Sequence, residues 1–125
     1  MSFVQERTCC PQCGNQAEFE ADCWGSQRTT CLICGYYEHE SLKFDAEGNC
    51  CGSRRDIGKG FGVLGYRYID DNFFWNHFLK TPGESHDAER WLRSALRSGA
   101  VDVDTAYVTR WSDELNQVEV LVGDP

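Results

Sequence analysis

Alternating apolar and polar side chains predict β-strands in the first third of the chain. Apolar and acidic residues alternate over 17–23, and after a short turn residues 27–30 bring the chain back. A further alternating stretch over 36–44 ends at the turn-forming residues 45–49. The pattern therefore predicts an antiparallel sheet of three strands.

The last third of the chain follows a different period. Apolar residues spaced by three or four positions predict an amphipathic helix over residues 82–98, which ends at Gly99. Two alternating stretches, 106–111 and 117–122, are joined by the polar residues 112–116 and predict a β-hairpin. Strands and helix in separate segments are typical of an α+β fold.

An aromatic segment, residues 73–79, precedes the predicted helix. Phe74 and Phe78 are one helical turn apart, so the spacing favours a short buried helix, with a strand as the alternative. A short helix, a longer helix and a hairpin would resemble the winged-helix family, and this resemblance implies that residues 82–98 form its recognition helix. Acidic residues in the hairpin would repel a phosphate backbone, which disfavours a DNA-binding wing.

The spacing of the cysteines carries the clearest chemical information. Two C-x-x-C-G units, one with Cys10 and Cys13 and the other with Cys31 and Cys34, are separated by seventeen residues. In such a unit a tight turn brings two thiolates to one metal, and two units complete a tetrahedron. Because four thiolates leave no position for water, we expect one structural Zn²⁺, with iron or ordinary buried or disulfide-forming cysteines as the alternatives.

These knuckles and the predicted strands make residues 9–44 resemble the zinc-ribbon family. The resemblance implies three strands with Cys10, Cys13, Cys31 and Cys34 as zinc ligands. Zinc ribbons occur in transcription factors, RNA-polymerase subunits, ribosomal proteins and phage proteins, so the resemblance implies a binding module without choosing its partner. We therefore expect an N-terminal zinc ribbon in residues 1–47, followed by a small α+β domain in residues 48–125.

The other four cysteines do not repeat this spacing. The spacing of Cys9 to Cys13 is C-x-x-x-C, which does not match the knuckle turn, so Cys10 is preferred as the ligand. Cys23 lies far along the predicted hairpin from the metal and is expected to be a core residue. Cys50 and Cys51 are adjacent, and neighbours on a strand point to opposite faces. We expect free or buried thiols at these four positions, with a second metal site as the alternative.

Composition bounds the function classes. The 125-residue chain has 12 basic and 20 acidic side chains, a net charge of −8, and 41% hydrophobic residues. Such acidity disfavours general binding to nucleic acid, which requires clustered cations. Apolar runs are far shorter than the about 20 residues that span a bilayer, and residues 1–7 do not resemble a signal peptide, so we expect a cytoplasmic protein without a membrane partner.

Two groups of cations are the candidates for partner binding. Within the glycine-rich stretch 48–68, we expect a flexible basic loop over residues 54–60 that leads into a glycine-punctuated strand. The loop could touch a phosphate backbone or an acidic partner, and the predicted helix carries cations on successive turns of its outer face. A solvated loop and a solvated helix face are the alternatives. The candidates are Arg54, Arg55 and Lys59 in the loop, and Arg90, Arg93 and Arg97 on the helix.

The three histidines lie in separate segments, and we expect no enzymatic activity because no nucleophile and base or open metal site can be assembled. The favoured function is an adaptor or regulator that docks on a protein, plausibly one that handles nucleic acid. One alternative is a small acidic inhibitor, of phage or immunity type, that blocks a cationic nucleic-acid site of its target. The other is direct nucleic-acid binding through the basic loop or a winged-helix-like C-terminal part.

Overall fold

The computed structural model describes residues 3–70 and 72–125 and contains two sheets and one α-helix, so the fold is of the α+β kind. The chain divides into two compact units. The first unit consists of residues 1–31 and 36–59, and the second of residues 32–35 and 60–125. Within the described part of the chain, no helix has the length and apolar character needed to cross a membrane.

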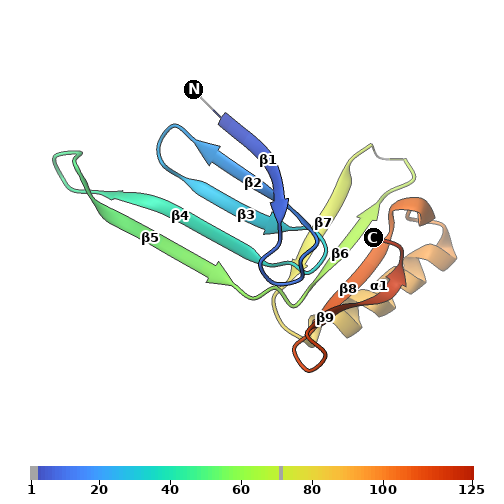
Figure 1. Cartoon of the computed structure of the whole chain (residues 1–125). Helices are drawn as coiled ribbons and strands as arrows, with labels where there is room; N and C mark the ends of the chain where they lie inside the picture. The colour runs from blue at the N-terminus through green and yellow to red at the C-terminus, as the bar shows by residue number, and fades with distance from the viewer. Residues whose placement is uncertain (1–2, 71) are drawn as a thin grey trace. The chain divides into compact units, whose positions relative to one another are not determined.

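The first unit is an antiparallel five-stranded sheet in which each strand pairs with the next along the chain (Figure 1). The three predicted strands are present, and one further strand lies at each edge. Ala17 lies opposite Cys31, and Thr30 lies opposite Tyr37. The strands are β1 (Phe3–Cys9), β2 (Gln16–Asp22), β3 (Gln27–Cys31), β4 (Tyr37–Phe44) and β5 (Cys50–Gly58).

The prediction of a flexible loop over residues 54–60 was wrong for residues 54–58, because they belong to β5. Arg55 lies opposite Glu40 and Arg54 opposite Ser41 on the neighbouring strand β4. The segment has few apolar residues, so alternation could not reveal it; its pairing with β4 does. The expected boundary after residue 47 falls within the turn between these two strands.

The first unit buries very little. Its buried described residues are Cys10, Ala17, Cys31 and Tyr36, whereas the strands β1 and β5 are exposed along nearly their whole length. Val4 in β1 and Ile57 in β5 remain 46% and 54% exposed. Both faces of this sheet are therefore largely open, and burial is concentrated beside the cysteines.

The second unit has a conventional core between a four-stranded antiparallel sheet and one helix (Figure 1). The sheet has the order β7-β6-β8-β9, and apolar side chains from its strands pack with Ala88, Leu92 and Ala95 of the helix. The elements are β6 (Gly62–Arg67), β7 (Phe74–Leu79), α1 (Glu84–Ser98), a short 3-10 helix η1 (Val103–Thr105), β8 (Tyr107–Ser112) and β9 (Gln117–Gly123).

The predicted helix and hairpin of this unit are confirmed. Helix α1 ends at Gly99, whose left-handed backbone (φ 73°) allows its N–H to bond the carbonyl oxygens of Ala95 and Leu96. Strands β8 and β9 pair as the hairpin, with Trp111 opposite Val118. Both elements bury one apolar side, which is why periodicity located them.

The aromatic segment is a strand and not the predicted short helix. Residues of β7 pair with β6, with Trp75 opposite Tyr66 and Phe78 opposite Val63. Aromatic side chains favour strands, and pairing with β6 satisfies the backbone of the segment. A strand at this position also removes the order of helices and hairpin on which the winged-helix resemblance was based.

Candidate metal centre

Each C-x-x-C-G unit forms the tight turn that its sequence predicts. In the first knuckle, the Cys10 N–H donates to the Asn15 carbonyl (2.7 Å) and the Gly14 N–H donates to the Cys10 carbonyl (2.9 Å). In the second knuckle, the Cys31 N–H donates to the Tyr36 carbonyl (2.9 Å). The glycine after each unit, Gly14 (φ 74°) or Gly35 (φ 81°), has the left-handed backbone that side chains disfavour.

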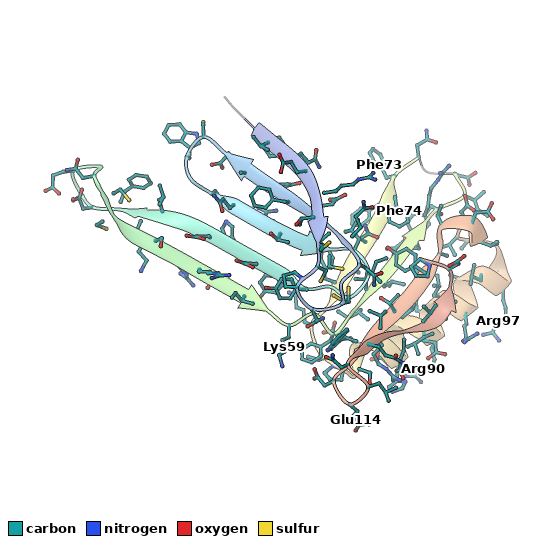
Figure 2. All side chains as sticks on the ribbon, viewed as in Figure 1. Lys59, Phe73, Phe74, Arg90, Arg97 and Glu114 are labelled. Carbon is teal, nitrogen blue, oxygen red and sulfur yellow. The ribbon has the colours of Figure 1, made fainter. Side chains whose placement is uncertain are left out.

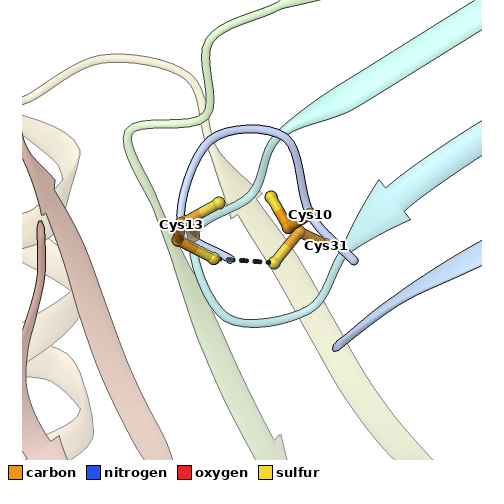
Figure 3. A group of neighbouring side chains, drawn as sticks. Cys10, Cys13 and Cys31 are labelled. Carbon is orange, nitrogen blue, oxygen red and sulfur yellow. Dashed lines mark hydrogen bonds between the residues drawn. The ribbon is translucent and has the colours of Figure 1, made fainter. Parts of the chain in front are cut away.

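The two knuckles bring four sulfur atoms together. The Sγ atoms of Cys10, Cys13, Cys31 and Cys34 all lie within 4.8 Å of one another, and Figure 3 shows Cys13 and Cys31, whose sulfurs are 3.5 Å apart. Zinc bonds of about 2.3 Å in a tetrahedron place sulfurs about 3.8 Å apart, whereas a disulfide needs about 2.05 Å. The four cysteines are thiols in an arrangement that can hold one metal ion.

Neighbouring N–H groups donate hydrogen bonds to two of these sulfurs. The backbone N–H of Gln12 donates to Cys10 Sγ (3.4 Å), and the side-chain amide of Asn15 donates to Cys13 Sγ (3.4 Å). Hydrogen bonds of this kind orient metal-bound sulfurs and offset part of their negative charge. Asn15 is an outer contact that spacing alone did not identify.

The four thiols of the cluster are largely shielded from solvent. Cys10, Cys31 and Cys34 are buried and Cys13 is half-buried. Burial, together with the nearby Glu38 carboxylate, raises the pKa of Tyr36, and its hydroxyl donates to Glu38 (3.2 Å). Tyr36 is thus a protonated phenol that packs in the first unit, and four sulfur ligands leave no free position for a metal-bound water.

The loop that carries Cys34 is held within the second unit by side-chain hydroxyls of β8. Tyr107 Oη donates to the Leu32 carbonyl (3.2 Å), and Thr109 Oγ1 donates to the Ile33 carbonyl. The same Thr109 oxygen accepts from the Val63 N–H (3.1 Å). Leu32 and Ile33 are the two residues between the cysteines of the second knuckle, so these bonds fix its turn.

The remaining cysteines lie outside the cluster. Cys9, Cys23, Cys50 and Cys51 are all exposed thiols. Across residues 3–70 and 72–125, these four form no further group of three or more potential metal ligands. Cys23, which was expected in the core, is exposed because it lies in the open turn after β2.

The candidate cations are not gathered into one basic patch. Arg54 and Arg55 are consecutive on β5 and point to opposite faces of the sheet. Arg54 pairs with Asp56 (3.2 Å), and Arg55 pairs with Glu38 (2.5 Å). Lys59 follows the end of β5 (Figure 2).

The helix cations are likewise accompanied by carboxylates. Arg90 pairs with Asp87 (2.7 Å), and Arg93 pairs with Glu89 (3.0 Å) and also donates to the Leu121 carbonyl (3.0 Å). Arg97 lies in the last turn of α1, where a cation interacts favourably with the helix dipole (Figure 2). The outer face of α1 is consequently a mixed-charge surface.

One polar pair on the first sheet was not anticipated from the sequence. Ser26 Oγ lies 3.0 Å from His39 Nε2, and Asp56 is the cross-strand neighbour of His39. Asp56 is, however, engaged by Arg54, and the Ser26 N–H already donates to Asp22 (3.1 Å). Among the residues that the structure describes, the pair therefore has neither an orienting carboxylate contact nor a free serine N–H to stabilise an oxyanion.

No family model, no curated protein and no solved structure matches this chain. The geometry of the cysteine cluster and of the surfaces around it is therefore the basis for assigning a function.

Proposed function

We propose that the protein is a non-enzymatic zinc-ribbon binding module, an adaptor or regulator that docks on another protein. The observation that carries this proposal is the cluster of four thiols, of which Cys10, Cys13 and Cys31 belong to the first unit and lie where burial in its described part is concentrated. A metal at that position supplies stability to an otherwise open sheet, which leaves the sheet surface available for a partner.

Zinc is the metal that best fits the four thiols. Tetrahedral sulfur sites select zinc or iron, and zinc is redox-inert and typical of closed structural sites. With Cys10, Cys13, Cys31 and Cys34 as thiolates, the ion would tie the first knuckle to the second. The cluster would hold the turns in place and would not activate water.

One face of the first sheet has the character of a protein-binding surface. The cross-strand register places Val4, Phe19 and Ile57 on the same face. Glu6 and Glu40 share this face with the ion pair of Glu38 and Arg55, so the face combines exposed apolar groups with a small excess of negative charge. A partner surface that is apolar and basic, as in a protein that handles nucleic acid, would complement it.

An inhibitor that occupies a cationic site of its target is the second candidate. The net charge of −8 favours it, because carboxylates on a small folded protein can imitate phosphates. Direct nucleic-acid binding is less well supported, since four of the six candidate cations already pair with carboxylates.

A capture experiment with two matched variants tests the docking proposal. Val4 and Gln5 are exposed neighbours on the edge strand β1, and consecutive strand residues point to opposite faces. Zinc-loaded wild type, Val4→Lys and Gln5→Lys would be used as baits in a lysate of the source cell, with and without nuclease. We expect a specific protein that survives nuclease and that is lost only with Val4→Lys.

The outcomes separate the alternatives. Recovery that disappears with nuclease would overturn protein docking in favour of nucleic-acid contact. Equal recovery by both variants would contradict the assigned face. An activity assay of the captured protein, with and without an excess of the wild-type chain, then distinguishes an inhibitor from an adaptor.

A further inference from the structure

Strand β7 is an edge strand without the features that normally keep edges from pairing. It forms one margin of the second unit's sheet and pairs only with β6, in a regular register. Its sequence, Phe74–Leu79, contains no Pro and no Asp, Glu, Lys or Arg. Proteins generally protect an edge with charge, proline or a bulge, because its outward N–H and C=O groups otherwise recruit another strand.

The other edges of the described sheets do have protection. Strand β1 carries Glu6 and Arg7, and β5 carries two arginines and an aspartate. Strand β9, at the opposite margin of the same sheet as β7, carries Glu119, and its pairing with β8 contains a register shift. The uncharged edge is thus particular to β7.

Large aromatic side chains on both faces of β7 are only partly covered. Phe74 and Phe78 are 44% and 37% exposed, and Trp75 on the opposite face is 49% exposed. Leu79 is four residues after Trp75, so the two side chains lie on the same face of β7. Because Leu79 is buried in the core with α1, Trp75 lies on the helix side of the sheet. Exposed apolar surface on both faces of one edge marks an interaction site.

We propose that β7 pairs with β7 of a second copy of this chain, forming a two-fold symmetric dimer with a continuous sheet of eight strands. The charges at the two ends of β7 favour a second copy of the chain as the partner. The uncharged strand is flanked by Asp70 on its N-terminal side and Lys80 on its C-terminal side, and neither forms an ion pair among the described residues. Antiparallel self-pairing brings the acidic end of one strand toward the basic end of the other.

The symmetry of this arrangement also accounts for the aromatic residues. Antiparallel pairing of identical edges has its two-fold axis perpendicular to the sheet, so both α1 helices lie on the same side. Trp75 lies opposite Tyr66, whose ring is 4.9 Å from that of Trp91 on α1. The dimer would cover Trp75 on this side and Phe74 and Phe78 on the other, and it extends the proposed function by making the binding module bivalent.

The test is the mass of the zinc-loaded full chain in solution over a wide range of concentration. Sedimentation or light scattering should give twice the monomer mass of 14.2 kDa, with dissociation to monomer on dilution. Trp75→Lys places a charge on the uncharged edge, and it should weaken the dimer by about a hundredfold or more. The control, Val120→Lys, places the same charge at an exposed site on the opposite edge strand β9 and should leave the dimer intact.

A charge exchange provides a second measurement that does not alter the strand. Asp70→Lys and Lys80→Asp should each weaken the dimer by about two- to thirtyfold, and the double variant should restore it, because the exchanged ends again attract. Loss of partner capture without loss of the dimer would affect only the proposed docking face. A chain that stays monomeric at all concentrations, or a double variant weaker than both single variants, would overturn the proposal.

Discussion

The two units of this protein differ in how much apolar surface their folds bury. The second unit packs Leu92 of α1 against Val108 and Val122 of its sheet and so excludes water from a continuous apolar core. The first unit has more strands, yet its buried described residues are Cys10, Ala17, Cys31 and Tyr36. We propose that a metal ion bound by the four thiols takes the place of a second layer over this five-stranded sheet.

The physical reason lies in the surface that each unit can remove from water. A single-layer sheet leaves both faces open, so hydrogen bonding between strands must be supplemented by another source of free energy. Binding of a structural zinc ion to four thiolates supplies about 10–16 kcal/mol in small zinc domains. The core of the second unit needs no such contribution.

The largest expected effect follows from removing one ligand of the proposed zinc. Cys31→Ser should leave the first unit unfolded even with zinc present, because three thiolates hold the ion far less tightly and no apolar core replaces it. Protection of the strand amides in NMR hydrogen exchange would measure this loss of structure. Cys50→Ser, which alters an exposed thiol of the same unit, should retain zinc and fold; an unfolded Cys50→Ser would contradict the comparison.

Truncation of apolar side chains should distinguish the units next. Leu92 is fully buried, so Leu92→Ala should lower the free energy of unfolding by about 3 kcal/mol. Ile57, on the open face of β5, is 54% exposed, and Ile57→Ala should cost less than about 1 kcal/mol. Denaturant unfolding of the zinc-loaded variants measures both, and equal losses would show that the first unit has an apolar core after all.

Glycine substitutions probe how tightly each backbone is packed. A Cβ at Gly62 (φ 152°) would stand 2.1 Å from the Thr109 carbonyl oxygen, so Gly62→Ala combines a clash with backbone strain and should cost about 2–3 kcal/mol. Gly48 (φ 84°), in the turn between β4 and β5, has no atom within 4 Å of such a Cβ. Gly48→Ala should cost only about 1 kcal/mol of strain; thermal unfolding that ranks the two in the reverse order would contradict this difference in packing.

Two buried hydroxyls of the second unit should respond differently to removal, and one of them gives the smallest expected effect. Thr109 Oγ1 donates to the Ile33 carbonyl and accepts from the Val63 N–H, so Thr109→Val should cost about 1–3 kcal/mol. The buried Oγ1 of Thr105 has no hydrogen-bond partner among the described residues, and Thr105→Val should be neutral or slightly stabilising. A destabilised Thr105→Val in chemical unfolding would mean that its hydroxyl has a partner.

Sequence reasoning located the elements whose residues carry a local pattern. Helix α1 and the hairpin of β8 and β9 each bury one apolar side, so the periodicity of their apolar residues predicted them. The candidate metal ligands were predicted for a different reason, because two thiolates on one tight turn require the C-x-x-C-G spacing. In both cases the information lies within a few neighbouring residues.

The elements that were missed depend on partners distant in sequence. Strand β5 has little apolar alternation and is defined by its register with β4, while β7 has aromatic residues that fit a helix or a strand equally well and is decided by pairing with β6. The ion pair of Arg55 with Glu38 and the contact of Thr109 with Ile33 likewise arise only in the folded chain. The local pattern of residues cannot predict contacts between residues that are distant in sequence.

Hydrogen exchange read separately in the two units, before and after a strong chelator is added to the zinc-loaded wild-type protein, tests the central claim most directly. If metal takes the place of a core in the first unit, amides of β2, β3 and β4 should lose their protection on chelation, while amides of β6 and β8 keep theirs. Protected amides in β2, β3 and β4 without metal would contradict the claim.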